Sequence, residues 1–184
     1  MLLMTLASPH ALCQHRLWTE TLASLDSNRV AFDRIANAPK GTVSLSAHEV
    51  GFSQDSVANL RLDRKTGQLR SFDDLVNSMR THGWKDDAID VVRMPDGVFT
   101  SLDNTRLLAA RHARINVQAR VRGLDEALTP TETLRFSKSG FDAPSTWGDA
   151  ARVRIMSQQD TMRFPWQSWG HRFPNGSIYD PQIK

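Results

Sequence analysis

Four consecutive residues could act on a phosphate group: Asp103, Asn104, Thr105 and Arg106. They lie where a strand-like segment ends and a helix should begin, because Asp103 is a good N-cap whose carboxylate can accept backbone N–H groups. The first turn of a helix exposes unpaired N–H groups and favours an anion. An arginine in that turn adds a guanidinium, which binds phosphate oxygens well. The spacing therefore indicates phosphoryl-transfer or phosphodiester chemistry.

The residue types suggest separate roles at this junction. Asp103 could bind Mg²⁺ or orient a water molecule, and Arg106 could offset charge that develops on a phosphoryl group. Asn104 would orient the substrate, Arg111 would be a secondary anion contact, and Gln54 would reach the site from another strand. The simpler alternative is that Arg106 is a surface arginine paired with Asp103.

The surrounding segment predicts the elements that position these residues. Strand-forming residues over 89–94 and 98–102 flank a proline and glycine turn at 95–97, which is typical of a hairpin. A helix over 104–114 and a strand over 116–121 should follow. The predicted unit is hairpin, helix, strand.

Elsewhere the sequence predicts a strand over 42–46 and a helix over 145–158. Another helix should begin at Ser71, with Asp74 completing a capping box, and end at Gly83. Its inward stripe has helical spacing and consists of Phe72, Leu75, Val76 and Met79.

The remaining segments have weaker patterns. Residues 8–37 are predicted to be helical, and residues 55–62 to form either a helical turn or an extended segment. Residues 61–70 should be a loop. Residues 124–139 give a mixed pattern with a boundary at 129–131.

Three parts are expected: a helical extension over 1–40, a domain over 41–160, and an irregular aromatic tail over 161–184 that packs on the domain. Trp147 and Asn175 are candidate contacts to a nucleotide or to DNA, since aromatic side chains can stack on bases. The alternative is that the aromatic residues form a lid packed over the core.

Composition is that of an ordinary globular chain, with 40% hydrophobic and 23% charged residues. Cys13 is the only cysteine, and no apolar stretch approaches the roughly 20 residues that span a bilayer. These observations favour a cytoplasmic location. They exclude an intrachain disulfide and a cysteine-based zinc site.

Positive charge is concentrated in the second half of the chain. Residues 1–103 contain 11 Lys and Arg against 13 Asp and Glu, whereas residues 104–184 contain 12 against 7. From 104 to 124 there are five arginines and no acid. Such a patch suits DNA or a nucleotide, although it could also be a solvated face. The candidate anion contacts within it are Arg111, Arg114 and Arg120.

Several common catalytic motifs are missing. The six histidines show no HExxH spacing, and the sequence has no GxxxxGK[ST], GxGxxG or GxSxG motif. Zinc hydrolysis, a standard phosphate-binding loop and a nucleophile elbow are therefore not indicated.

The run from Val50 to Val121 resembles the ParB/sulfiredoxin superfamily, whose members carry a Gly-x-x-Arg type of motif that opens a helix. Ser101 to Ala110 fill that place, with Arg106 matching the arginine and Asp103 standing where many members have glycine. The chain lacks a cysteine at the motif and a helix-turn-helix after it. These departures argue against a sulfiredoxin-type reaction and against a chromosome-partition protein.

Nearly the whole chain is similar to plasmid fertility inhibition factors, through residues 51–54, 145–149 and 174–177. The resemblance implies an α+β fold of ParB/sulfiredoxin type, a small mixed sheet flanked by helices. It also implies ATPase and DNase activity with ATP and Mg²⁺. The implied partners are DNA, a nucleotide and the coupling protein of a type IV secretion system, with peripheral association at the inner membrane.

The resemblance leaves different classes of function open. The chain could hydrolyse ATP and DNA and so stop a transferring strand. It could instead be a non-catalytic inhibitor that occludes the coupling protein, with its aromatic tail and N-terminal helices as the interface. A relative of polymorphic toxins is a third class.

Overall fold

The fold comes from a computed structural model, which describes residues 41–62, 67–158 and 169–184. The helix predicted over 8–37 lies outside the described residues. The chain divides into residues 1–40 and residues 41–184. All of the described residues belong to the second unit.

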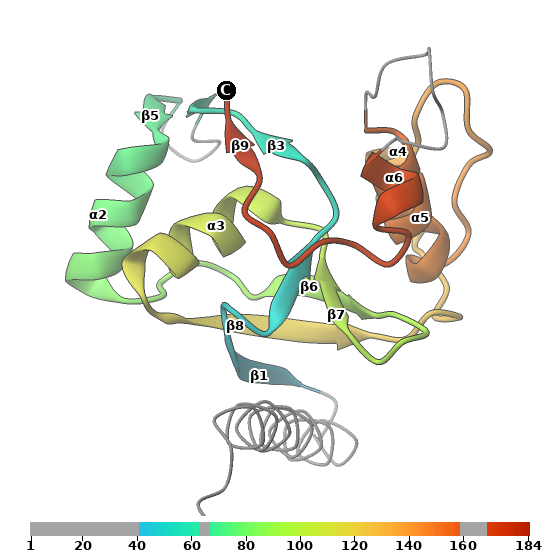
Figure 1. Cartoon of the computed structure of the whole chain (residues 1–184), viewed down its shortest axis with the longest axis horizontal. Helices are drawn as coiled ribbons and strands as arrows, with labels where there is room; N and C mark the ends of the chain where they lie inside the picture. Colours follow the sequence, from blue (N-terminus) through green and yellow to red (C-terminus); the bar gives the residue numbers. More distant parts are fainter. Residues whose placement is uncertain (1–40, 63–66, 159–168) are drawn as a thin grey trace, which may run out of the picture. The chain divides into compact units, whose positions relative to one another are not determined.

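A five-stranded mixed sheet forms the base of this unit (Figure 1). Its strands lie side by side in the order β1 (Thr42–Ser46), β8 (Asn116–Arg122), β6 (Ile89–Arg93), β7 (Phe99–Ser101) and β2 (Val50–Phe52). β6 runs parallel to β8 and β2 parallel to β7, whereas the pairs β1–β8 and β6–β7 are antiparallel. The predicted α+β class with a small mixed sheet and helices is therefore confirmed.

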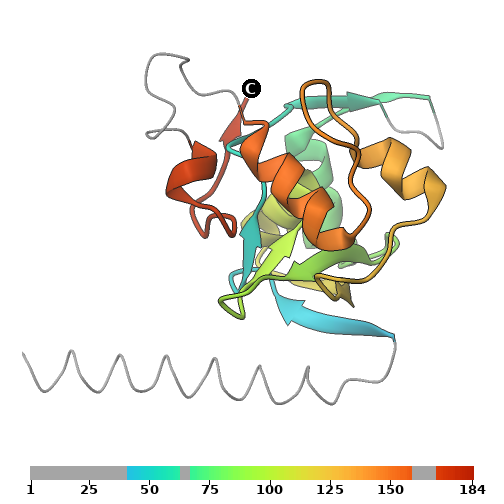
Figure 2. The ribbon, with the colours of Figure 1, turned by 90° about the vertical axis from the view of Figure 1, so that its right-hand side faces the viewer.

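The described helices stand over the sheet in two groups (Figures 1 and 2). The helices are α2 (Phe72–His82), α3 (Asn104–Ala113), α4 (Pro130–Phe136), α5 (Trp147–Met156) and α6 (Trp169–Arg172). α2 packs on α3, and α4 and α6 pack on α5. Two short ribbons complete the unit, namely β3 (Ser56–Val57) with β9 (Gln182–Ile183), and β4 (Leu60–Leu62) with β5 (Leu69–Ser71). None of the described helices has the length and apolar character needed to cross a membrane.

The central hairpin, helix and strand form as predicted. Gly97 takes a φ of 84° in the turn between β6 and β7, where the Met94 N–H donates to the Val98 carbonyl at 2.8 Å. β7 lies between β6 and β2 and is buried along its whole length. α3 then begins after Asp103 and ends at Arg114, which adopts the left-handed conformation with a φ of 59°.

The predicted α2 is also confirmed. Ser71 and Asp74 form the reciprocal capping box, and the Gly83 N–H closes the helix on the Met79 carbonyl. The stripe turns inward, since its buried members are Phe72, Val76 and Met79.

Two segments differ from their predictions. Residues 60–71 contain the antiparallel hairpin β4–β5 instead of a plain loop, with Leu62 opposite Leu69 and Arg61 opposite Arg70. The boundary predicted near residue 130 is the start of α4, which Thr129 caps. Proline is well tolerated in the first helical turn, so it opens this helix and does not interrupt it.

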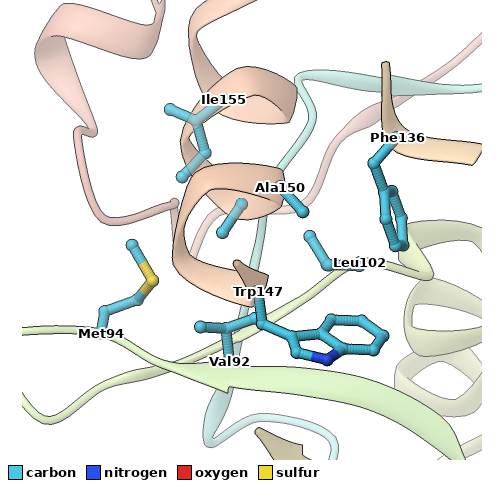
Figure 3. Close-up of a cluster of buried hydrophobic side chains, with 8 residues drawn as sticks. Val92, Met94, Leu102, Phe136, Trp147, Ala150 and Ile155 are labelled. Carbon is cyan, nitrogen blue, oxygen red and sulfur yellow. The ribbon is translucent and has the colours of Figure 1, made fainter. Parts of the chain in front are cut away.

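Trp147 lies in the hydrophobic core and is 1% exposed (Figure 3). Its indole packs at 5.6 Å from the Phe136 ring and 4.5 Å from the Arg122 guanidinium carbon. The cluster around it joins β6 and β7 to α4 and α5, and consists of Val92, Met94, Leu102, Phe136, Trp147, Ala150, Ala151 and Ile155. Trp147 is therefore a core residue, and almost none of its surface is open to a nucleotide or to DNA.

The described part of the C-terminal tail packs on the sheet edge. Ser177 exchanges backbone hydrogen bonds with Phe52 at 2.7 and 2.9 Å, which continues the sheet beyond β2. Gly176 has a φ of 94°, and a Cβ on it would lie 2.7 Å from the Thr100 hydroxyl. A side chain at this position would therefore push the tail off the sheet.

We expect Trp147→Ala to lower the free energy of unfolding by about 3–5 kcal/mol, because it removes a large buried side chain and leaves a cavity. Urea denaturation followed by circular dichroism would measure the change. Leu134→Ala is the matched control, because Leu134 is 80% exposed and its loss should change stability by less than about 0.5 kcal/mol. Equal losses in the two variants would contradict the described core.

Candidate functional site

The Asp103–Arg106 pair occupies the junction between β7 and α3. Asp103 caps the helix: its carboxylate accepts the Arg106 backbone N–H at 3.4 Å, and its own N–H donates to the Ser101 hydroxyl at 2.9 Å. The Arg106 guanidinium folds back on the same carboxylate, with Nε at 2.9 Å and Nη2 at 2.7 Å from Oδ2. Its Nη1 donates to the Asp87 carbonyl at 2.6 Å. The pairing of Arg106 with Asp103, given above as the simpler alternative, is therefore present.

This pairing keeps Asp103 ionised. Burial by itself would raise the pKa of the carboxyl group, but the charge and hydrogen bonds of Arg106 outweigh it and hold the pKa of Asp103 below its usual value. The Arg106 side chain is 23% exposed and that of Asp103 14%. The pair is thus partly shielded from water and more than a loose surface contact.

Asn104 links the junction to the end of β2 and is 2% exposed. Its Oδ1 accepts the Ser53 N–H at 2.8 Å, and its Nδ2 donates to the Ser53 hydroxyl and to Gln54 Oε1, each at 3.0 Å. Because β2 and β7 are parallel neighbours, their carboxyl ends meet at one edge of the sheet. The structure therefore brings Gln54 beside Asn104.

Two adjoining cavities lie at this junction. The outer one has a volume of about 450 Å³ and is bounded by the β4–β5 hairpin, the start of α2 and Arg106. The inner one has a volume of about 210 Å³ and reaches Gln54, Asn104 and Arg154. The residues that line both are Ala58, Arg61, Asp103, Thr105 and Arg135.

Three arginines that were not predicted as site residues line the inner cavity: Arg61 of β4, Arg135 of α4 and Arg154 of α5. A signal for Arg154 exists in the sequence. It follows two buried alanines by three and four residues, so it lies on the inward face of its helix. Arg61 alternates with two leucines, which places it on the opposite side of a strand from them.

Other predicted anion contacts lie away from the junction. Arg111 is 8% exposed and pairs with Asp180 at 2.7 Å. Its other donors bind the backbone carbonyls of Ala47, Val50 and Ile178. Arg111 thus anchors the tail to α3 and β2, which is a structural role. Arg114 caps the far end of α3, about 15 Å along a ten-residue helix.

Arg120 and Asn175 are also engaged elsewhere. Arg120 Nε donates to the Asp90 carboxylate at 3.1 Å on the sheet. Asn175 donates to Asp96 at 2.9 Å, in the turn that precedes β7. Asp103 follows β7, so Asn175 and the junction lie at opposite ends of that strand. Of the predicted site residues, the structure groups Gln54, Asp103, Asn104 and Arg106.

The surroundings of Asp103 do not fit a Mg²⁺ site held by this chain. Mg²⁺ requires oxygen ligands in near-octahedral geometry, whereas the Asp103 carboxylate already accepts Arg106 and faces Arg61 and Arg135 across the cavities. Within the described part of the chain, no group of three or more His, Cys, Asp or Glu residues could hold a metal ion. The described residues that line the two cavities include five arginines and three aspartates, so the site favours an anion.

Comparison with protein-family models, with curated proteins and with solved structures found no significant match for this chain. Its function is therefore inferred from the geometry of the site and from the sequence resemblance.

We expect Asp103→Asn to lower the free energy of unfolding by about 1–3 kcal/mol at pH 7. Asparagine keeps the N-cap acceptor but removes the charge paired with Arg106. The folded pKa of Asp103 lies below the unfolded value of about 3.9. Its contribution to stability is therefore complete above that value and is lost as the pH falls through the folded pKa. Denaturation curves between pH 2 and 7 would measure this.

The control is Asp142→Asn, because Asp142 is exposed in the loop before α5. The free energy of unfolding of this variant should stay within about 0.5 kcal/mol of that of the unsubstituted protein. The difference in the free energy of unfolding between Asp103→Asn and the unsubstituted protein should shrink below pH 4. A difference that stays constant there would contradict the ion-pair account.

Proposed function

We propose that this protein is a plasmid-encoded fertility inhibition factor on a ParB/sulfiredoxin-like domain, which blocks conjugative and T-DNA transfer through a type IV secretion system. The order of β6, β7, α3 and β8, with an arginine-bearing motif at the head of α3, supports this proposal. The coupling protein of the secretion channel is the proposed partner. Peripheral association with the inner membrane belongs to the same proposal.

Hydrolysis of ATP and cleavage of DNA are the proposed activities. The observation that carries them is the pair of cavities at the head of α3, where a helix N-terminus and several arginines face the same space. A volume of about 450 Å³ lies within the usual range for small-molecule sites. Phosphate groups are the ligands that this combination of donors and positive charge recognises best.

Asp103 and Arg106 are the proposed catalytic pair, because both line the outer cavity. With a pKa below its usual value, Asp103 is a weak proton acceptor and serves better to orient a water molecule. Asn104 is buried and holds Gln54, so it acts as a positioning residue. Mg²⁺ would accompany ATP on its own phosphates, and no residue of this chain is assigned to it.

A non-catalytic inhibitor is the second candidate, and exposed leucines favour it. Leu60, Leu62 and Leu69 are 59%, 63% and 68% exposed on the β4–β5 hairpin. Leu62 and Leu69 are cross-strand partners, so they share one face of the ribbon. Such an apolar face is typical of a protein-binding surface.

We expect Arg106→Gln to reduce ATP hydrolysis and DNA cleavage by the purified chain by roughly 100-fold, because it removes the guanidinium that fixes the Asp103 carboxylate in the site. Hydrolysis assays and plasmid nicking would measure this. Arg114→Gln is the matched control, because it lies at the other end of the same helix and should retain full activity.

Conjugation assays with the same variants separate the two candidates. Loss of both hydrolysis and transfer inhibition in Arg106→Gln supports the enzyme. If transfer remains blocked without hydrolysis, the inhibitor is the correct function. If Arg106→Gln keeps full hydrolysis, the catalytic assignment is wrong.

A further inference from the structure

The described side chains that line the inner cavity carry more positive than negative charge. Arg61, Arg135 and Arg154 line it from three different elements. Among the described residues that line this cavity, Asp103 is the one carboxylate, and its charge is already offset by Arg106 at 2.7 Å. Arg61 and Arg135 are exposed and Arg154 is half-buried, so the three like charges repel one another with partial screening by water, and an anion between them would be favoured.

One side-chain donor of Arg154 has no acceptor among the residues that the structure describes. Its Nη2 donates to Gln54 Oε1 at 3.1 Å. Its Nε is buried and, within the described part of the chain, has no hydrogen-bond partner. A buried donor without an acceptor is costly, so native proteins seldom retain one. Gln54 holds Arg154 in the orientation that leaves Nε unpaired. Asn104 in turn holds Gln54 in place.

The electrostatics of Arg154 favour binding of an anion. Burial lowers the pKa of its guanidinium, Asp103 opposes that effect, and the positive charges of Arg135 and Arg61 lower the pKa further. The guanidinium stays charged in proteins even so. An anion placed among the three arginines would remove this mutual repulsion.

The start of α3 adds to the positive potential. Asn104 and Thr105 belong to the first turn of this ten-residue helix, and both line the inner cavity. The N-terminal end of a helix dipole favours an anion. The Thr105 side chain is also a hydrogen-bond donor at the cavity wall.

We propose that the inner cavity is a phosphate-binding subsite in which Arg154, with Arg61 and Arg135, holds a terminal phosphate group, while Arg106 holds Asp103. This inference rests on the proposed function, because it identifies the part of the ligand that enters the site. A volume of about 210 Å³ is below the roughly 300 Å³ of small-molecule sites. It therefore fits one phosphate group, and the rest of the ligand extends into the outer cavity.

The shared chemistry is a phosphate monoester, which could be the end of a nucleotide, the end of a DNA strand or free phosphate. Isothermal titration of the full chain with inorganic phosphate, ATP, and a single-stranded oligonucleotide with and without a 5′-phosphate separates these sources. Binding of the phosphorylated oligonucleotide alone identifies DNA ends. Binding of ATP and inorganic phosphate identifies a nucleotide site.

Arg154→Gln should weaken phosphate binding at least tenfold, and Arg152→Gln, on the same helix but exposed, should not change it. Gln54→Glu places a carboxylate against Arg154 and should also weaken binding at least tenfold without unfolding the chain. Thermal denaturation in phosphate-free buffer is the second readout. Arg154→Gln should melt no lower than the unsubstituted protein there, and phosphate should raise the melting temperature of the unsubstituted protein only.

The outcomes distinguish this inference from the proposed function. If Arg154→Gln binds phosphate as well as the unsubstituted protein while Arg106→Gln loses it, the subsite is wrong and the proposed activity survives. If the unsubstituted protein binds no phosphate, ATP or DNA end, the subsite and the proposed activity are both wrong. A lower melting temperature of Arg154→Gln in phosphate-free buffer, with unchanged phosphate affinity, would show a structural arginine and overturn the subsite.

Discussion

The buried amide of Asn104 is the interaction on which the site depends. It bonds to the backbone and hydroxyl of Ser53 and to Gln54, and so ties the end of β2 to the start of α3. An amide that is 2% exposed must satisfy its donors and acceptor within the protein. The hydrogen bonds of Asn104 fix the start of α3 and, through Gln54, also orient Arg154 of α5.

Many of the arginines in the second half of the chain bond to acidic residues of the same fold. Arg120 and Arg122 both bond to Asp90 on the sheet, and Arg111 bonds to Asp180 of the tail. Four of the five arginines between residues 104 and 124 therefore pair with acidic side chains, and Arg114 caps the end of α3. The charge that faces a cavity belongs mainly to Arg61, Arg135 and Arg154, which are far apart in the sequence.

Local chemistry explains which parts of the fold the sequence could predict. The turn at Gly97 and the caps at Ser71 and Asp103 depend on neighbouring residues only, and all three were predictable. The β4–β5 hairpin was missed because its leucines stay exposed, so no buried face marks the strands. Trp147 was assigned to a ligand because its residue type suits stacking, whereas its burial depends on contacts between distant elements.

Asp103 stands where many members of the resembling superfamily have glycine, and this difference decides which anion binds at the start of α3. A glycine there would leave the first N–H groups of α3 and the guanidinium of Arg106 open to an external anion. Asp103 supplies that anion from the chain itself and neutralises Arg106. An external phosphate must then be bound by side chains from other elements, and β4, α4 and α5 each provide an arginine. The motif at the junction therefore locates the site, while the affinity for an anion comes from arginines of three separate elements, whose approach to one cavity no local pattern could identify.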